Sequence, residues 1–356
     1  MITNYAFRVD ASEGIGHGHL IRCLTLANEL KNSSIKCLFI ANKLSYFLQE
    51  RVLSMGHEIY NLPSSYANKF SWKKDALFTQ KILQKHKISW LIVDHYLIEK
   101  KWETIQRKNC KNIMVIDDLV NREHECDLLL DQNFGRKNID YYNMVPKSAT
   151  VISGLNFSLI GEEFLKIRDK FILDRNFRSL KNILITMGGS DPKNLTTMAL
   201  KEIAKTNLDS SSIISVILPK KSQNILDVKS VLKRNFPFKS NLLFDVNDMS
   251  KILVSQDLII GAMGISVWER CYLGVPSISM VVEDSQDAVA KKLHHSGASI
   301  VVNRSYSDGF TIQSAIDYFT SSENLKHTSK IAANLVDGQG VKRVVDMIKK
   351  NSHKNI

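Results

Sequence analysis

The sequence of 356 residues has few cysteines and no long apolar run, and both absences exclude classes of protein. Its five cysteines are Cys23, Cys37, Cys110, Cys126 and Cys271. Because their number is odd and no two form a C-x-x-C pair, they argue against a disulfide framework and a zinc site and favour a reducing compartment. The apolar runs are far shorter than the roughly 18–20 residues of a membrane-spanning helix, and the N-terminus lacks a secretion-signal pattern. We therefore expect a cytoplasmic protein with no membrane span.

The composition lacks the signs of disorder and of nucleic-acid binding. With 44% hydrophobic and 24% charged residues, 16 Gly and 6 Pro, the chain has globular averages, which exclude collagen-like and low-complexity chains. The net charge of +12 is compatible with nucleic acid, an anionic membrane surface or a phosphorylated small ligand. Because the basic residues are scattered and form no stripe interleaved with aromatic residues, we expect no nucleic-acid partner.

Short apolar runs alternate with helical patterns along the chain. The predicted strands are residues 35–40, 88–93, 112–116 and 127–130 in the first half, and 182–187, 213–218, 241–244, 257–262, 276–282 and 298–302 in the second. Strands that alternate with helices predict parallel sheets covered by helices on both faces. We therefore expect two α/β domains. The predicted parts are domains at residues 1–160 and 181–335, a linker at 161–180, and a C-terminal helix with a basic tail at 336–356.

The first candidate site is a glycine-rich turn at residues 14–18, between a short β-like run and a helical pattern. Glycines let backbone N–H groups approach a ligand, and the start of the following helix offers unsatisfied donors. His17 and His19 lie in this region. The turn has neither the G-K-[ST] of a P-loop nor the G-x-G-x-x-G of a dinucleotide fold, which disfavours ATP and NAD. A tight turn with a purely structural role explains the glycines equally well.

Two further glycine turns follow predicted strands in the second half. The segment 185–194 indicates either a phosphate-facing turn or a helix start capped by Ser190 or Asp191. The segment 257–286 contains a glycine turn and then a helix, which could bind a diphosphate, and its Glu269 could accept two hydrogen bonds from a ribose diol. Glu269 could equally be a surface charge that complements the helix dipole. Together, the three glycine-bearing strand ends favour a nucleotide-sugar site.

Polar residues also follow predicted strands in the first half. Asp94, His95 and Tyr96 come directly after the run 88–93, and loops beyond the carboxyl ends of parallel strands often carry active-site residues. His95 taken alone is more typical of a hydrogen-bonded loop histidine. Asn133 follows a later strand and is a further candidate. No set of His, Cys, Asp and Glu has metal-ligand spacing, so we expect neither a metal nor another cofactor.

Together these segments resemble the UDP-sugar hydrolases of pseudaminic acid biosynthesis, which are relatives of GT-B glycosyltransferases. The resemblance rests on R-V-D-A-S-x-x-I-G-x-G-H-x-x-R-C-L-x-L-A at residues 8–27, V-D-H-Y at 93–96, M-G-G-S-D-P-x-N at 187–194, G-A-x-G-x-S-x-W-E-x-x-x-L-G-V-P-S-I at 261–278 and D-G-x-G-x-x-R-V at 337–344. It implies a GT-B-like α/β fold in which an N-terminal sugar-binding, catalytic domain and a C-terminal UDP-binding domain face a cleft. The implied reaction is hydrolysis of UDP-2,4-diacetamido-2,4,6-trideoxy-β-L-altropyranose to the free sugar and UDP.

The resemblance also implies roles for individual residues. His19 matches the fixed histidine of the family motif, whereas His17 falls on a variable position, so we expect His19 to activate the water as a general base. Tyr96 and Asp94 would orient the water or the sugar, and Glu269 would bind the ribose. The other candidate substrate- or UDP-binding residues are Gly16, Gly18, Arg22, Asn133, Gly188, Gly189, Ser190, Gly264, Ile265, Ser266, Ser285 and Gln286. Ser285 stands where the family usually has Asn, and Gly161 stands where it tends to have Arg.

Three functions are compatible with these observations. The first is a metal-independent hydrolase that acts as a monomer on a small-molecule UDP-sugar. The second is a GT-B glycosyltransferase that moves the sugar from UDP to an acceptor, which requires an acceptor or membrane surface on the first half of the chain. The third is a non-catalytic module that binds nucleotide sugars, in which His19 could be replaced without consequence.

Overall fold

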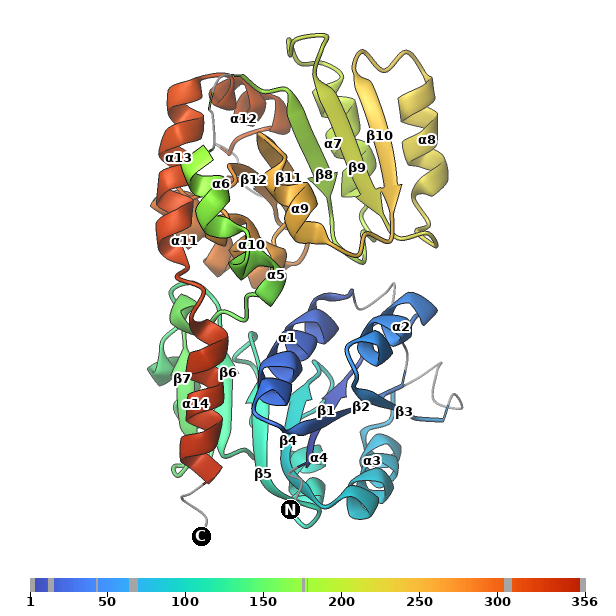
Figure 1. The fold of residues 1–356 in the computed structure, drawn as a ribbon, viewed down its shortest axis with the longest axis vertical. Helices are drawn as coiled ribbons and strands as arrows, with labels where there is room; N and C mark the ends of the chain where they lie inside the picture. Colours follow the sequence, from blue (N-terminus) through green and yellow to red (C-terminus); the bar gives the residue numbers. More distant parts are fainter. Residues whose placement is uncertain are drawn as a thin grey trace. The chain divides into compact units, whose positions relative to one another are not determined.

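The chain folds into two compact units (Figure 1). The computed structural model describes residues 4–11, 16–42, 44–63, 70–174, 177, 179–303 and 309–352. The first unit comprises Met1–Leu159 and Gln339–Ile356, and the second comprises Ile160–Gly338. The segment expected as a linker contains two short helices, α5 (Glu162–Leu165) and α6 (Arg168–Asp174), and belongs to the second unit.

The first unit is built around a seven-stranded sheet in which every neighbouring pair is parallel. Its strands, in the order in which they pair, are β3 (Glu58–Asn61), β2 (Lys36–Ala41), β1 (Asn4–Val9), β4 (Ile88–Asp94), β5 (Cys110–Ile116), β6 (Leu128–Asp131) and β7 (Thr150–Ser153). Its helices are α1 (Gly18–Asn32), α2 (Tyr46–Ser54), α3 (Trp72–His86), α4 (Lys100–Gln106) and α14 (Gly340–Ser352).

The central strands of the first unit carry apolar side chains on both faces, and each face of the sheet packs into its own hydrophobic core. In β4, Trp90 and Ile92 belong to one hydrophobic core, and Leu91 and Val93 belong to another. This alternation follows from the two-residue period of a strand. All four predicted strands of the first half are present. The sequence reading missed the edge strands β3 and β7, because they are only four residues long and carry polar or half-buried side chains.

The second unit contains a six-stranded parallel sheet, and all six predicted strands are present. In pairing order they are β10 (Lys239–Phe244), β9 (Ile213–Leu218), β8 (Asn182–Thr186), β11 (Leu258–Ala262), β12 (Ser277–Met280) and β13 (Ile300–Val302). Besides α5 and α6, its helices are α7 (Leu195–Ile203), α8 (Ile225–Lys233), α9 (Met249–Val254), α10 (Ser266–Tyr272), α11 (Asp287–Ser296), α12 (Ile312–Phe319) and α13 (Ser322–Leu335). The prediction of two Rossmann-like α/β domains is confirmed.

The C-terminal helix α14 returns to the first unit. Its apolar face is buried in the same core as α1, through Val341, Val344, Val345 and Ile348. Trp90 Nε1 donates a hydrogen bond to Ser352 Oγ at 2.7 Å. A Cβ on Gly340 would lie 2.2 Å from the carbonyl oxygen of Ser158, so only glycine fits where this helix begins. The helix is therefore part of the first unit and not a separate appendage.

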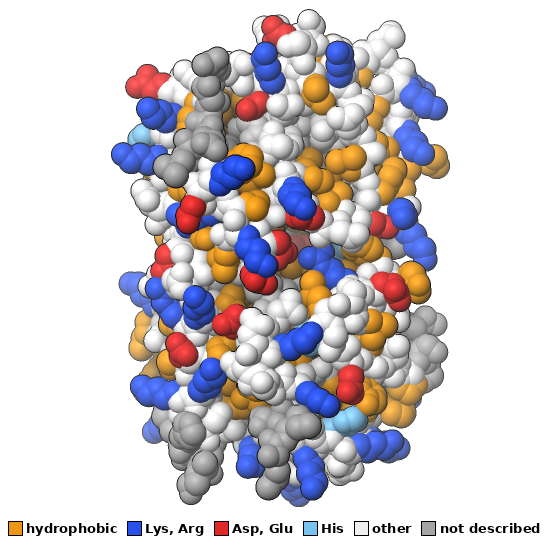
Figure 2. Space-filling model, viewed as in Figure 1, with side chains coloured by type: hydrophobic (Ala, Val, Ile, Leu, Met, Phe, Trp, Pro, Cys, Tyr) orange, Lys and Arg blue, Asp and Glu red, His pale blue; other side chains and the backbone are white. Residues whose placement is uncertain are grey.

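The distribution of surface charge and the state of the cysteines agree with what the sequence predicts. On the face shown in Figure 2, Lys and Arg side chains are spread out and interspersed with acidic ones. All five cysteines are buried and free. Within the described ranges, no helix combines the length and the apolar character needed to cross a membrane.

Candidate active site

The first unit brings together four of the residues that the sequence singled out. Asp94 is the last residue of β4, and β4 lies beside β1 in the sheet. His19 and Arg22 lie in the first turns of α1, which follows β1. Because they are three residues apart, they share one face of the helix. Tyr96 comes two residues after the end of β4, so all four side chains lie at the carboxyl ends of two neighbouring strands.

Asp94 is the centre of this cluster. Its side chain is fully buried and accepts hydrogen bonds from Arg22 Nε at 2.5 Å and from Arg22 Nη2 at 2.6 Å. His19 Nδ1 lies 2.5 Å from the Oδ1 atom of Asp94. Burial alone would raise the pKa of Asp94, but the charge of Arg22 and the hydrogen bonds from Arg22 and His19 lower it below its usual range. Asp94 is therefore ionised.

The ionised carboxylate decides the tautomer of His19. A carboxylate only accepts hydrogen bonds, so the proton of the imidazole lies on Nδ1, which donates to Asp94. The other ring nitrogen, Nε2, then carries a lone pair. Arg22 Nη2 also lies 3.0 Å from His19 Nδ1 and donates to the same carboxylate. The pair has the arrangement of a base that is oriented by a buried carboxylate.

Tyr96 packs against His19 and connects it to a residue that the sequence reading missed. The two rings meet edge to face, with centroids 4.5 Å apart. The phenol of Tyr96 donates to Asp118 Oδ2 at 3.3 Å, and Arg22 Nη1 donates to the same oxygen at 3.2 Å. Desolvation and the nearby charge of Asp118 raise the pKa of Tyr96, which keeps the phenol protonated. Asp118 comes two residues after β5, so the polar-after-strand signal that identified Asp94 could have found it.

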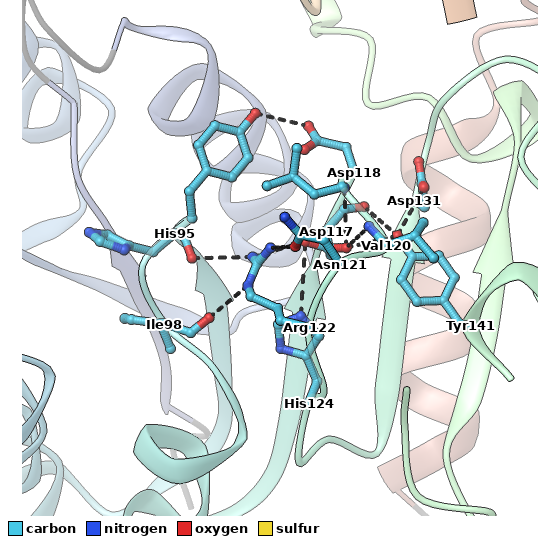
Figure 3. A network of polar contacts seen from close by, with 12 residues as sticks. His95, Ile98, Asp117, Asp118, Val120, Asn121, Arg122, His124, Asp131 and Tyr141 are labelled. Atoms are coloured by element: carbon cyan, nitrogen blue, oxygen red, sulfur yellow. Dashed lines mark hydrogen bonds and ion pairs between the residues drawn. The ribbon is translucent and has the colours of Figure 1, made fainter. Parts of the chain in front are cut away.

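The loop that carries Asp118 is held by a buried polar network (Figure 3). Asp117 Oδ2 accepts from the backbone N–H of Val120 at 3.0 Å, and Arg122 Nη2 lies 2.9 Å from Asp117 Oδ1. Tyr141 Oη lies 3.0 Å from Asp117 and 2.9 Å from Asp131. Val120 has φ +55°, which a β-branched residue rarely adopts. The network therefore stabilises a strained turn that places Asp118 beside Arg22.

His95 has a structural role in the first unit. It is buried, its Nε2 donates to Asp10 Oδ2 at 3.0 Å, and its Nδ1 accepts from the backbone N–H of Leu97 at 3.1 Å. Burial lowers the pKa of His95, which favours this neutral form. Asp10 also pairs with the buried Arg8 at 2.6 Å. The interpretation of His95 as a hydrogen-bonded loop histidine is confirmed, and its bond fastens the end of β1 to the end of β4.

The remaining predicted residues of the first unit follow β1 and β6. Gly16 has φ +86°, a conformation that favours glycine, and Gly18 begins α1. His17 is the N-cap residue of that helix. Asn133 lies in the turn after β6, two strands from β4, and its backbone N–H donates to Asp131. Gly14 and Ile15 of the glycine motif lie outside the described residues.

In the second unit, the predicted UDP-binding residues follow three neighbouring strands: β8, β11 and β12. Gly188, Gly189 and Ser190 follow β8; Gly264, Ile265 and Ser266 follow β11; Ser285 and Gln286 follow β12. Lys193 Nζ donates to the carbonyl of Val282, which connects the first of these turns to the third. Gly264 needs no unusual backbone conformation, and a Cβ there would meet nothing within 4 Å. The fold therefore does not itself require glycine at 264.

Two polar side chains of these turns form hydrogen bonds with the protein's own backbone. The carboxylate of Asp191 accepts from the backbone N–H groups of Leu195 and Thr196 at 2.7 and 2.9 Å, so Asp191 satisfies the start of α7. The N-cap residue itself is Asn194, and the helix begins three residues after Pro192, so the expected position of the cap is wrong. Gln286 Oε1 accepts from the backbone N–H groups of residues 282 and 283, at 3.0 and 3.2 Å, and closes the turn after β12.

The alternative interpretation of Glu269 as a surface charge is wrong. Glu269 lies in the first turn of α10 and is only 8% exposed. Helix α13, which packs against α10, comes from a distant part of the chain, so the local sequence does not show this burial. Among the described residues, no three His, Cys, Asp or Glu side chains are arranged to hold a metal ion.

The sequence is similar to a known domain family and to two known proteins. Residues 182–348 match the glycosyltransferase family 28 C-terminal domain. The chain is 31% identical over 206 residues to the UDP-2,4-diacetamido-2,4,6-trideoxy-β-L-altropyranose hydrolase of Campylobacter jejuni, covering 57% of this chain and 67% of that protein. It is 26% identical over 285 residues to an uncharacterised protein of Methanocaldococcus jannaschii, covering 79% of this chain but only 56% of the relative.

A solved structure shows the same fold. The crystal structure of MurG from Acinetobacter baumannii superposes with a TM-score of 0.66 at 16% identity, covering 98% of this chain and 99% of that one. The expectation of a GT-B-like pair of α/β units is therefore confirmed.

Proposed function

Because this chain belongs to the family of the UDP-2,4-diacetamido-2,4,6-trideoxy-β-L-altropyranose hydrolases, we propose that it processes a UDP-sugar and hydrolyses it to the free sugar and UDP. The observation that carries the proposal is the buried His19–Asp94 pair, in which Asp94 leaves a lone pair on His19 Nε2. Hydrolysis needs such a base to activate water, whereas a module that only binds nucleotide sugars does not.

In the proposed reaction His19 Nε2 removes a proton from water as the water oxygen attacks the anomeric carbon. The bond from that carbon to the diphosphate oxygen breaks, and UDP leaves with the electron pair. The imidazole lies beside one guanidinium, of Arg22, and two carboxylates, of Asp94 and Asp118. Together these three groups carry one net negative charge. That charge favours the imidazolium form that the proton transfer creates. Tyr96, whose ring packs on His19 and whose phenol stays protonated, would orient the water or the sugar.

We assign UDP binding to the second unit. Glu269 is a buried carboxylate in the first turn of α10 and suits a ribose diol, which offers two hydrogen-bond donors to one carboxylate. The open space at Gly264 suits a diphosphate that approaches the backbone closely. In this scheme the first unit supplies the groups that activate water, and no step requires a metal ion.

Transfer of the sugar to an acceptor other than water is the second candidate. The match to a glycosyltransferase domain and the fold shared with MurG favour it. The two reactions differ in whether the sugar is released when no acceptor is present.

The test is incubation with a panel of UDP-sugars without acceptor, followed by NMR of the products. We expect free 2,4-diacetamido-2,4,6-trideoxy sugar and UDP at catalytic turnover, whereas turnover only on addition of an acceptor would establish the transferase. His19→Asn should abolish UDP release and retain UDP binding. His17→Asn, two residues earlier, is the matched control and should keep its activity. Undiminished turnover in His19→Asn would remove the general-base role.

A further inference from the structure

Among the described residues three arginines are fully buried, and one of them differs from the other two. Arg8, Arg22 and Arg270 are all at most 1% exposed. The first two each contact two carboxylates, which are Asp10 and Asp75 for Arg8, and Asp94 and Asp118 for Arg22. Arg270, in α10 of the second unit, forms no ion pair with any described residue. Within the part of the chain that the structure describes, it is a buried cation without a counter-ion.

The contacts of Arg270 are all with neutral oxygens. Nη1 donates to Ser266 Oγ, and Nη2 donates to the carbonyl of Ala262 and to Ser279 Oγ, each at 3.2 Å. Its Nε has no partner within the described part of the chain. Burial lowers the pKa of Arg270 to about 10, and the weaker effects of Cys271 and Glu269 do not offset it. An uncompensated buried cation is unfavourable unless an anion comes close to it.

The segment 261–266 makes room for this guanidinium and leaves room for a ligand. A Cβ on Gly261 would lie 2.8 Å from Arg270 Nη1, so glycine at this position allows the guanidinium to pack against the end of β11. Three residues later, a Cβ on Gly264 would meet nothing within 4 Å. One short segment therefore has an unpaired buried charge packed against it and open space beside it.

We propose that Arg270 is the positive charge with which this segment holds the diphosphate of UDP, acting as a positioning residue through Ser266 and the backbone of the turn. The inference rests on the proposed binding of UDP by the second unit. Because Ser266 Oγ accepts from Arg270 Nη1, the hydroxyl keeps its own hydrogen for donation to a phosphate oxygen. In a buried setting the guanidinium also attracts the diphosphate without touching it, since the surrounding dielectric is low.

The test compares ligands with and without phosphate in Arg270→Met and Arg270→Lys, by calorimetry with UDP and by NMR titration with uridine. We expect Arg270→Met to weaken UDP binding by about 10- to 100-fold, as for loss of a charged partner, and to leave uridine binding unchanged. Arg270→Lys should recover most of the UDP affinity. Without ligand, Arg270→Met should melt close to the wild type, because the loss of three hydrogen bonds to neutral oxygens is offset by the removal of an uncompensated buried charge.

The outcomes separate this inference from a structural role and from the proposed function. Lys205→Met removes an exposed lysine of the same unit and is the charge control, which should bind UDP as the wild type does. Unchanged UDP affinity in folded Arg270→Met would overturn the inference, and so would an equal loss for UDP and uridine. If Arg270→Met does not fold, Ser266→Ala should still weaken UDP binding several-fold, and no effect would count against the inference. A wild-type protein that binds no UDP would refute the proposed function itself.

Discussion

Replacing Asp94 by Asn tests the proposed base most directly, because it removes one charge and keeps the size of the side chain. The carboxylate now accepts from His19 Nδ1 and from two nitrogens of Arg22. An asparagine offers one oxygen, which Arg22 will take, and turns its NH₂ group toward the imidazole. Nδ1 must then accept, which moves the proton of His19 to Nε2 and removes the lone pair that the reaction uses.

The size of the effect follows from the interactions lost. A hydrogen bond to a charged group contributes about 1.5–3 kcal/mol, which is about one to two powers of ten in rate for the imidazolium that Asp94 stabilises. The inverted tautomer adds to this loss, so we expect turnover to fall by about 10²- to 10⁴-fold. Asp94→Asn breaks the ion pair between Arg22 and Asp94, but Arg22 still pairs with Asp118. We therefore expect the variant to lose about 2–4 kcal/mol of folding free energy.

The pH dependence gives an independent check. Since the pKa of Asp94 is lowered in the folded protein, its contribution to stability is complete above the unfolded value, about 3.9, and is lost as the pH falls toward the folded value. The stability difference between wild type and Asp94→Asn should therefore be constant from pH 7 to about 5 and shrink below about 4. Single-turnover hydrolysis measures the loss of rate, and urea unfolding at each pH measures the stability difference. Calorimetry with UDP checks that the variant still binds the nucleotide. Wild-type turnover in a folded Asp94→Asn protein would refute the role of the pair.

Other residues and conditions give further predictions. Tyr96→Phe keeps the ring on His19 but loses the bond to Asp118, so kcat should fall by about 3- to 30-fold, less than for Tyr96→Ala; equal values for the two variants would deny the ring any role. Glu269→Gln should weaken UDP binding about tenfold and abolish the preference for UDP over 2′-deoxy-UDP, and an intact preference by calorimetry would exclude ribose binding. Hydrolysis should survive EDTA, whereas a loss restored by Mg²⁺ would contradict a metal-independent reaction. Burial lowers the pKa of His57 to about 4, so this residue should destabilise the fold as the pH falls from about 6.5 toward 4, and His57→Gln should flatten the urea-unfolding stability profile in that range.

The sequence by itself determined the architecture, because the relevant physics is local. A run of apolar residues that is buried on both faces predicts a strand of a parallel sheet without knowledge of its neighbours, and all ten predicted strands are present. The same rule placed His19, Asp94 and Gly264 at strand ends, where α/β proteins bind ligands. It failed at the edge strands β3 and β7, since their short and partly polar sequences carry little of that signal.

Only the tertiary structure decided which of these residues meet and which charges are compensated. His19 and Asp94 are 75 positions apart and are brought together because β1 pairs with β4, a neighbour relation that no local pattern contains. Asp118 enters the site for the same reason, through β5. That Arg270 has no counter-ion among the described residues is likewise visible only from the packed structure. Hydrophobic periodicity encodes which residues are buried, whereas the pairing of polar groups depends on strand order and packing across the whole unit.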